Sequence, residues 1–266
     1  RILQAAVDAW MRTHAEFCQA WTLPEFDMGD YRIQKGWQGT ILAFARAFIR
    51  QSKNLQLTPQ EISTRLESLQ QIPPFLQVGL DIYQDYQRGL AYRSAVDFDD
   101  LIRLALMALR SDPDYLSRLR YRWPYILEDE AQDSSFLQEQ ILRLLVGEDG
   151  NWVRVGDPNQ AIFETFTTAS PRFLLEFRNE PGVISRNLPN SGRSTRSIIT
   201  LANHLIDWTR DAHPEPELRG SLTLPYIELT PPNDPQPNPP DDPRGIMFGM
   251  KKYEPDQEIV DVVRSI

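Results

Sequence analysis

The short apolar run 125–127 ends in adjacent acids, of which Asp129 and Glu130 are the last two. A strand that ends in such a pair is typical of a nucleotide hydrolase. One carboxylate then holds Mg²⁺, and the next orients the attacking water. The pair has a second interpretation, because acids are also favoured at the start of a helix. The chemistry predicted for Asp129 and Glu130 therefore depends on their surroundings.

Two further blocks follow in the chain. The run 152–155 is followed by Gly156 and Asp157, and then by Gln160. A third block begins at 190–194 and continues with Ile198, Ala202 and Asn203. The Gln160 amide can donate to a phosphate oxygen and accept from water, which suits a residue near a nucleotide. Three blocks in this order are more specific than any one of them.

The first third of the chain is expected to be helical. Apolar residues recur at helical spacing over 1–23, 37–49 and 75–91, and no segment before residue 93 has a strand pattern. Thr58, Pro59 and Glu61 predict a capping box at the start of another helix. Asp97 is expected to cap the helix that follows.

The character of the sequence changes after this helix. Short strands are expected to alternate with helices, which predicts a parallel sheet with helices on its faces. Ligands bind at the carboxyl ends of the strands in such sheets, and both acid-bearing blocks lie there. The expected strands are 125–128, 152–155 and 183–185, and the expected helices are 135–146, 170–178 and 194–210.

Composition excludes several classes of protein. The 266 residues carry a formal net charge of −9, which argues against non-specific coating of nucleic acid but not against a local basic groove. Cys18 is the only cysteine, and the three histidines are scattered, so no disulfide or zinc site is expected. No apolar run approaches 18 residues and no signal peptide is evident, so we expect a cytoplasmic protein without a membrane partner.

The C-terminal part contains a proline-rich stretch. Prolines are dense between Pro231 and Pro240, and few apolar residues accompany them. We expect an exposed linker or loop with little packing. A strand over 245–248 and a helix over 256–266 are expected beyond it.

These blocks resemble the UvrD/Rep/PcrA group of superfamily 1 helicases. Residues 97–102 are similar to the segment of this family that reads Asp-Phe-Asp-Asp-Leu, and 129–133 are similar to its motif II, Asp-Glu-x-Gln-Asp. Residues 155–163 are similar to motif III, and 190–203 to motif IV. The resemblance implies an α/β fold: a partial RecA-like parallel sheet with flanking helices, plus a helical subdomain like the family's 1B.

The resemblance also implies roles for the nucleotide-side residues. Asp129 would hold Mg²⁺, and Glu130 would orient or deprotonate the hydrolytic water. Gln160 would sense the γ-phosphate and pass its state to the DNA site. Gly156 and Asp157 would belong to the nucleotide-binding region, so the implied cofactors are ATP and Mg²⁺.

The remaining implied roles come with departures from the family pattern. Arg193 would contact the γ-phosphate as an arginine finger, but the segment before it is one residue longer than in the family, and Arg196 is a competitor. Phe163 and Phe166 would stack on single-stranded bases, and packing in the core is their alternative. Glu164 stands where an arginine is usual, and it would repel a nearby phosphate.

No Gly-x-x-x-x-Gly-Lys-Ser/Thr loop occurs in the sequence, so the usual phosphate cradle is missing. We therefore expect a segment of a longer helicase, with negligible ATP hydrolysis by the segment alone. The resemblance divides it into a helical 1B-like subdomain (1–93), the later part of domain 1A (94–185) and the start of domain 2A (186–266), with a linker at 225–244. The full-length protein would step along single-stranded or partly duplex DNA. A non-enzymatic binding or assembly module, and the helicase-like part of a helicase–nuclease, are the alternatives.

Overall fold

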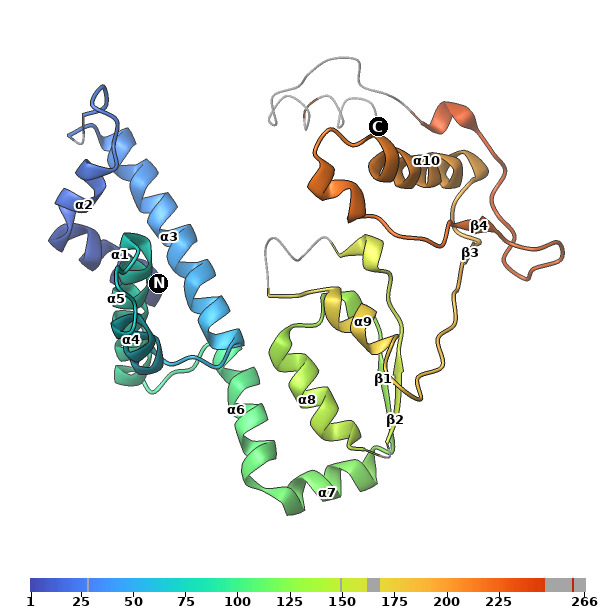
Figure 1. Cartoon of the computed structure of the whole chain (residues 1–266), viewed down its shortest axis with the longest axis horizontal. Helices are drawn as coiled ribbons and strands as arrows, with labels where there is room; N and C mark the ends of the chain where they lie inside the picture. Colours follow the sequence, from blue (N-terminus) through green and yellow to red (C-terminus); the bar gives the residue numbers. More distant parts are fainter. Residues whose placement is uncertain (28, 149, 162–167, 247–259, 261–266) are drawn as a thin grey trace. The chain divides into compact units, whose positions relative to one another are not determined.

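The computed structural model describes residues 1–27, 29–148, 150–161, 168–246 and 260. The chain forms two compact units, Arg1–Val183 and Ile184–Ile266 (Figure 1). Both helices and short parallel strands are present, so the fold is of the mixed α/β kind that the sequence predicts.

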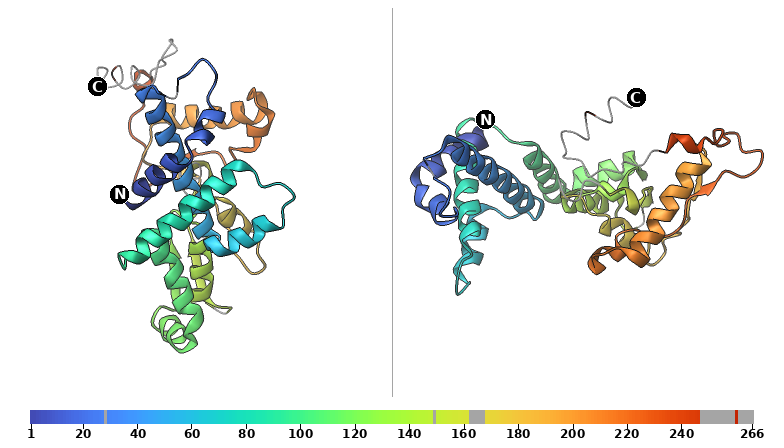
Figure 2. Two further views of the ribbon diagram at one scale, coloured as in Figure 1. Left: turned by 90° about the vertical axis from the view of Figure 1, so that its left-hand side faces the viewer. Right: turned by 90° about the horizontal axis from the view of Figure 1, so that it is seen from above.

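The first unit begins with helices that pack around two apolar clusters (Figure 2, blue to teal). These helices are α1 (Ile2–Thr13), α2 (Ala15–Ala20), α3 (Tyr31–Asn54), α4 (Pro59–Glu67) and α5 (Pro74–Tyr92). Their buried apolar side chains recur at helical spacing, which is why the periodicity could be read from the sequence. The clusters comprise Ala6, Val7, Trp10, Ile41, Ala45, Val78 and Ile82, and Ile49, Ile62, Leu66, Leu80 and Tyr83.

Local capping chemistry sets the starts of several helices. The Thr58 hydroxyl accepts from the Glu61 amide, and the Glu61 carboxylate accepts from the Thr58 amide, so the predicted capping box of α4 is confirmed. Asp97 caps α6 (Phe98–Ser111) in the same way with Asp100, which confirms its predicted role. The helix α7 (Pro113–Arg122) follows, with Asp112 at its N-cap.

A buried lysine joins the N-terminal helices to α6. The Lys53 side chain is 0% exposed, and its Nζ lies 2.6 Å from Asp97 Oδ2 and 2.8 Å from Asp100 Oδ2. The Tyr86 hydroxyl of α5 also donates to Asp97 Oδ2, at 2.8 Å. Three helices, α3, α5 and α6, therefore meet at one charged cluster.

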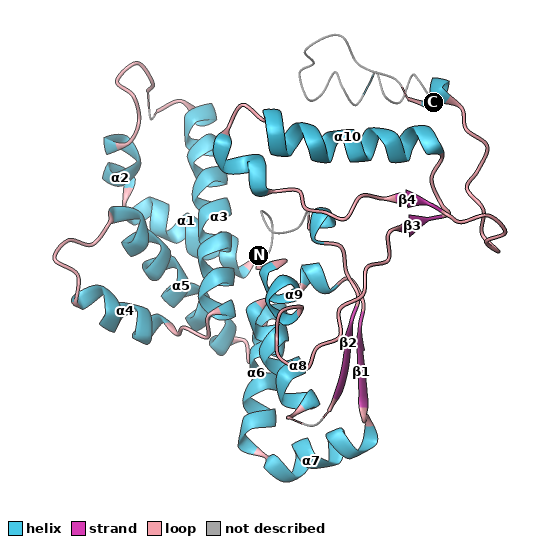
Figure 3. Cartoon of the chain, turned by 45° about the vertical axis from the view of Figure 1, so that its right-hand side comes forward, coloured by secondary structure: helices cyan, strands magenta, loops and turns pink. Residues whose placement is uncertain are grey.

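The strand pair lies in the later part of the first unit. The strands β1 (Tyr125–Glu128) and β2 (Asn151–Arg154) pair in parallel, with Glu128 opposite Arg154. The helix α8 (Phe136–Val146) connects them, and α9 (Arg172–Phe177) follows β2. Both helices cover one face of the pair (Figure 3). The predicted parallel β-α-β unit is confirmed, with β2 beginning one residue earlier than expected.

The other face of this strand pair is exposed and apolar. Leu127 is 76% exposed and Val153 is 50% exposed, and Tyr125 and Val155 are also exposed. Their alternation with half-buried residues along each strand follows from the period of two in a strand.

The second unit contains a smaller sheet. The strands β3 (Asn190–Ser191) and β4 (Glu228–Leu229) pair in parallel, and α10 (Arg196–Ala212) lies between them in sequence. The strand predicted over 183–185 is wrong: Ile184 is 79% exposed and the segment has no strand partner. The chain turns at Gly182, with φ of 85°, and the first strand after this turn is Asn190–Ser191, which pairs with Glu228–Leu229.

The proline-rich stretch is exposed and lacks regular secondary structure over residues 231–242, as predicted. The expectation that it packs little is wrong. Asn238 Nδ2 donates to the carbonyls of Ser191 and Ser194, and Asn238 Oδ1 accepts from Thr230. Asp241 accepts from the amide and the hydroxyl of Ser197 in α10. Two polar side chains, Asn238 and Asp241, therefore attach the stretch to the rest of the second unit.

The strand predicted over 245–248 is not borne out in its described half, because Gly245 ends the 3₁₀ helix Pro243–Gly245 and residue 246 has no regular structure; residues 247 and 248 lie outside the described residues. The helix predicted over 256–266 lies outside them except for residue 260. Within the described ranges, no helix combines the length and apolarity that crossing a bilayer requires.

Candidate functional site

The candidate site lies at the carboxyl ends of β1 and β2. The pairing of the two strands continues beyond their formal ends, because the Val155 amide donates to the Glu128 carbonyl at 2.8 Å and the Ala131 amide donates to the Val155 carbonyl at 2.9 Å. Asp129 and Glu130 lie between these two hydrogen bonds, and both are exposed. The backbone on either side of the two acids is therefore fixed, while their carboxylates face solvent.

The chain turns sharply at Glu130. Its backbone is left-handed, with φ of 52° and ψ of 40°, which costs a non-glycine residue about 1–3 kcal/mol. Asp129 Oδ1 accepts the Glu130 amide at 3.0 Å. Strained backbone of this kind persists only where the surrounding contacts hold it in place.

Neither acid caps the helix that follows. The N-cap of α8 is Ser135, which forms a capping box with Gln138. Glu130 lies at the N-cap position of the short 3₁₀ helix Ala131–Asp133, but its side chain makes no capping hydrogen bond there. The interpretation of the two acids as caps of the helix near residue 134 is therefore wrong.

Gln132 is a buried amide beside these exposed acids. It is 2% exposed. Its Nε2 donates to Glu130 Oε2 at 2.7 Å, and its Oε1 accepts the Asp157 amide at 3.1 Å. The sequence placed Gln132 in a motif but assigned no role to it, because the bond to Asp157 spans 25 residues.

The turn after β2 brings Gln160 back to Asp157. Asp157 Oδ1 accepts the Asn159 amide at 2.9 Å, and Asp157 Oδ2 accepts Gln160 Nε2 at 2.9 Å. Gln160 is exposed at the end of a short 3₁₀ helix, Pro158–Gln160. Four predicted site residues, Asp129, Glu130, Asp157 and Gln160, therefore lie at the ends of two adjacent strands, and Gly156 joins β2 to this turn.

A charged cluster supports the strands from the side that α8 and α9 cover. The Arg154 side chain is 0% exposed, with Nε 2.6 Å from Glu128 Oε2 and Nη1 2.8 Å from Glu139 Oε2. Its guanidinium also lies 4.4 Å from the centroid of the Trp152 ring. Burial raises the pKa of the Glu139 carboxyl above its usual range, although Arg154 and Arg143 oppose the shift. The sequence analysis missed this cluster.

The acids suit a magnesium ion that is shared with a phosphate. In the part of the chain that the structure describes, no three His, Cys, Asp or Glu side chains gather closely enough to hold a metal alone. Mg²⁺ is usually bound by one or two carboxylates together with water and substrate phosphates. The exposed carboxylate of Asp129, which the resemblance gives as the metal residue, is a hard oxygen donor of the kind that could share such an ion.

Other predicted site residues lie elsewhere. Arg193 is exposed in the turn between β3 and α10, in the second unit, and Arg196 is the first residue of α10. Phe163 and Phe166 lie outside the described residues, so the stacking prediction stays a prediction.

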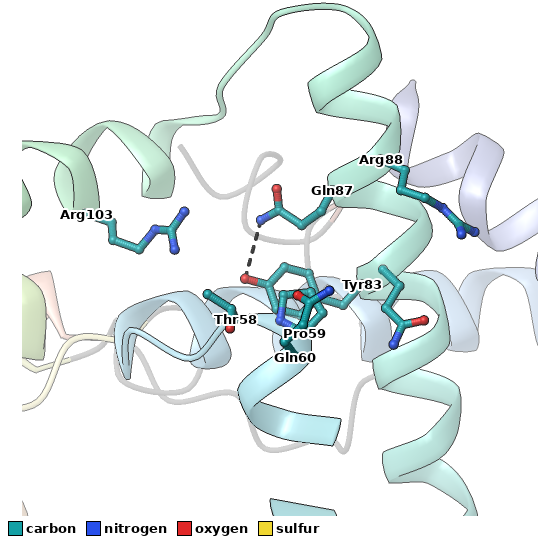
Figure 4. A pocket seen from close by; sticks show the side chains of 8 residues that line it. Thr58, Pro59, Gln60, Tyr83, Gln87, Arg88 and Arg103 are labelled. Carbon is teal, nitrogen blue, oxygen red and sulfur yellow. Dashed lines mark hydrogen bonds between the residues drawn. The ribbon is translucent and has the colours of Figure 1, made fainter. Parts of the chain in front are cut away.

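A cavity of about 410 Å³ lies among the N-terminal helices, and none of the predicted site residues lines it. Arg103 of α6 extends into it toward Gln87 and Tyr83 of α5, whereas Arg88 points away (Figure 4). The candidate site is instead an open edge of the sheet.

Comparison with known proteins shows the family. The family model of the UvrD/REP helicase N-terminal domain matches residues 13–182, so the chain belongs to the UvrD/REP helicase family. The chain is 33% identical over 164 residues to the ATP-dependent DNA helicase UvrD2 of Mycobacterium tuberculosis (strain H37Rv), which covers 59% of this chain and 23% of that protein. It is 30% identical over 168 residues to the ATP-dependent DNA helicase PcrA of Leuconostoc citreum, which covers 63% of this chain and 22% of that protein. The match thus spans about a quarter of the length of these relatives.

Proposed function

We propose that this chain is the part of an ATP-dependent DNA helicase that carries the hydrolytic acids and the γ-phosphate sensor. The observation that supports the proposal is the position of Asp129 and Glu130. They are exposed at the carboxyl end of β1, directly beside the end of β2 that carries Asp157 and Gln160. Ligands bind at this edge in parallel α/β sheets.

Each residue has a proposed task. Bound Mg²⁺ would neutralise phosphate charge, and Asp129 is the residue proposed to hold it. Glu130 accepts a proton from water or orients the water for attack on the γ-phosphate. Gln160 is free to exchange its bond to Asp157 for one to the γ-phosphate, because it is exposed and its amide is a donor. Gly156 and Asp157 are proposed to belong to the nucleotide-binding region.

The wider assignments are proposals of the same kind. Residues 1–93 correspond to a 1B-like helical subdomain, 94–185 to the later part of domain 1A, and 186–266 to the start of domain 2A. Arg193 is proposed as the arginine that the second motor domain contributes. Phe163 and Phe166 are proposed to stack on single-stranded bases, and the DNA partner is single-stranded or partly duplex.

A second candidate is a non-enzymatic helicase-like module. One observation favours it, because these 266 residues contain no phosphate-binding Gly-Lys-Ser/Thr loop. The exposed pair Asp129 and Glu130 has no use in such a module, so mutation of the pair distinguishes the two candidates.

The test is Glu130→Gln in the full-length protein. Loss of the carboxylate should lower DNA-stimulated ATP turnover by about 10²–10⁴-fold, the range for a general base, while ATP binding persists. Glu67→Gln makes the same chemical change at an exposed position in α4 and should leave turnover unchanged. Equal turnover in wild type and Glu130→Gln would reject the hydrolytic role.

A further inference from the structure

Gln132 is a buried polar side chain that follows the exposed acids Asp129 and Glu130. Its amide is 2% exposed, and the adjacent Ala131 is fully buried. A buried amide needs a partner for its oxygen and for its nitrogen, because an unpaired group costs about 1–3 kcal/mol. The role of Gln132 can be inferred from its two hydrogen-bond partners.

Those partners lie on different strands. Nε2 donates to the Glu130 carboxylate at 2.7 Å, just after β1, and Oε1 accepts the Asp157 amide at 3.1 Å, just after β2. The orientation of the amide follows from chemistry, since a carboxylate only accepts and a backbone amide only donates. Any flip of the side chain would break both bonds.

Gly156 provides the space that the Gln132 amide oxygen occupies. A Cβ on Gly156 would lie 2.5 Å from Gln132 Oε1 and 3.0 Å from the Ala131 amide nitrogen, so only glycine fits there. The Ala131 amide is itself bonded to the Val155 carbonyl at 2.9 Å. Gly156 therefore allows the Gln132 amide to reach the backbone of Asp157.

A further hydrogen bond links Asp157 to the short 3₁₀ helix that follows β2. Asp157 Oδ2 accepts Gln160 Nε2 at 2.9 Å, so Glu130, Gln132, Asp157 and Gln160 form one connected series across the two strand ends. The proposed water-orienting acid lies at one end and the proposed phosphate sensor at the other.

We propose that Gln132 is a positioning residue, which holds the Glu130 carboxylate for water attack and keeps it in register with the Asp157–Gln160 turn. This inference rests on the proposed function of Glu130. Gln132 does not touch the nucleotide in this role. It prevents the exposed Glu130 side chain from sampling other rotamers, and it couples the two strand ends that Gln160 and Glu130 occupy.

The first test uses Gln132→Met in the full-length protein. Methionine keeps the length of the side chain but removes both hydrogen bonds. We expect kcat for DNA-stimulated ATP hydrolysis to fall about 10–100-fold, the usual effect of losing a group that orients a site residue. The KM for ATP should change by less than about threefold, because bound nucleotide is not contacted. Gln71→Met, on an exposed residue after α4, is the matched control and should leave both constants unchanged.

The second test is a pH profile of Gln132→Glu. A protonated carboxyl group can donate to Glu130 and accept from Asp157, whereas a carboxylate repels Glu130 and cannot donate. The activity of Gln132→Glu relative to wild type should therefore rise as pH falls from about 8.5 to about 6, because burial and the neighbouring acid favour protonation. The relative activity of Gln132→Met should stay constant over the same range.

The third test examines the hydrogen bond itself in the 266-residue chain. The Asp157 amide should exchange its hydrogen at least about fivefold faster in Gln132→Met than in wild type. The amides of Ala131 and Val155, which pair the strands, should be unchanged and report that the fold is intact.

The outcomes separate the two proposals. Unchanged exchange at Asp157, or faster exchange with unchanged kcat, overturns the positioning role. A raised KM at constant kcat overturns it as well. If wild type and Glu130→Gln hydrolyse ATP equally, the proposed function fails and the positioning role fails with it, whereas exchange at Asp157 still reports whether the hydrogen bond exists.

Discussion

Arg154 is the residue on which the strand pair depends most. Its guanidinium is completely buried and forms ion pairs with Glu128 of β1 and Glu139 of α8. Its Nη1 also donates to the Phe173 carbonyl of α9 at 3.3 Å. One side chain thus connects two strands and two helices, directly behind the exposed acids.

Removing this arginine should be costly. In Arg154→Met the Glu128 carboxylate stays behind without its cation and Glu139 keeps only Arg143, and loss of one partner of a buried ion pair costs about 3–5 kcal/mol. The free energy of unfolding in urea, measured on the 266-residue chain, is expected to fall by that amount. Arg172→Met removes an exposed pair with Glu176 and should cost at most about 0.5 kcal/mol. Equal effects of the two substitutions would contradict the structural role of Arg154.

At the scale of elements, Lys53 joins α3 to the N-terminus of α6. Burial alone would raise the pKa of Asp97, but hydrogen bonds from Lys53, the Asp100 amide and the Tyr86 hydroxyl outweigh it and hold the pKa below its usual range. Burial, reinforced by Asp97, raises the pKa of the Tyr86 hydroxyl. The acids that the sequence predicted as helix caps are therefore also the counter-ions of a buried lysine.

Lys53→Met should destabilise the first unit by about 3–5 kcal/mol at neutral pH, because Asp97 and Asp100 lose their buried cation. Since the pKa of Asp97 is depressed in the folded state, its stabilising contribution is present above the ordinary value of about 3.9 and is lost as pH falls through the folded value. The difference between wild type and Lys53→Met should therefore narrow below about pH 4. Thermal unfolding across the pH range tests this, with Lys35→Met, on an exposed residue of α3, as the control. A difference that is constant across pH would count against the ion pair as the cause.

The proline-rich stretch is an element without regular structure that is nevertheless anchored. Gly192 explains part of the anchoring, since a Cβ there would lie 2.3 Å from the Gln236 carbonyl oxygen. Gly192, in the segment that is one residue longer than the family pattern, thus provides the space in which this stretch approaches β3.

Asn238→Ala should loosen the second unit. The substitution removes hydrogen bonds to the carbonyls of Ser191 and Ser194 and from Thr230, with a net loss of about 1–3 kcal/mol. Hydrogen exchange at the Thr230 amide should accelerate by about tenfold or more, since about 1.4 kcal/mol corresponds to a factor of ten. Gln236→Ala changes an exposed side chain of the same stretch and should leave exchange at Thr230 unchanged. Equal exchange in all three proteins would show that the stretch is only a linker.

At the scale of the whole molecule, the net charge of −9 opposes binding to nucleic acid phosphates. We expect the 266-residue chain to bind single-stranded DNA weakly, with an affinity that decreases steeply with salt, because contacts with DNA phosphates weaken as the salt concentration rises. Titration of a labelled oligonucleotide at low and at physiological salt measures both properties. Tight binding that does not weaken as the salt concentration rises would indicate that the DNA site lies elsewhere in the chain than at Phe163 and Phe166.

The sequence by itself determined the features that depend on neighbouring residues. The caps at Thr58 and Asp97 act over three residues, and the apolar periodicity of a helix repeats within one or two turns. For that reason most helices of the first unit, β1 and the order of the β-α-β unit could be predicted, as could the family, whereas α7 was not predicted. Asp129, Glu130 and Gln160 could be singled out as candidate site residues because each lies within a few residues of a predicted strand.

Only the tertiary structure decided which residues act together across long separations. The bond between Gln132 and Asp157 spans 25 residues, and the ion pair of Lys53 with Asp97 spans 44. A strand also needs a partner, which is why residues 183–185 looked like a strand in sequence but Asn190–Ser191 became one, paired with Glu228–Leu229. Such partners leave no local pattern, because a hydrogen bond or ion pair constrains the two positions in space and not the residues between them.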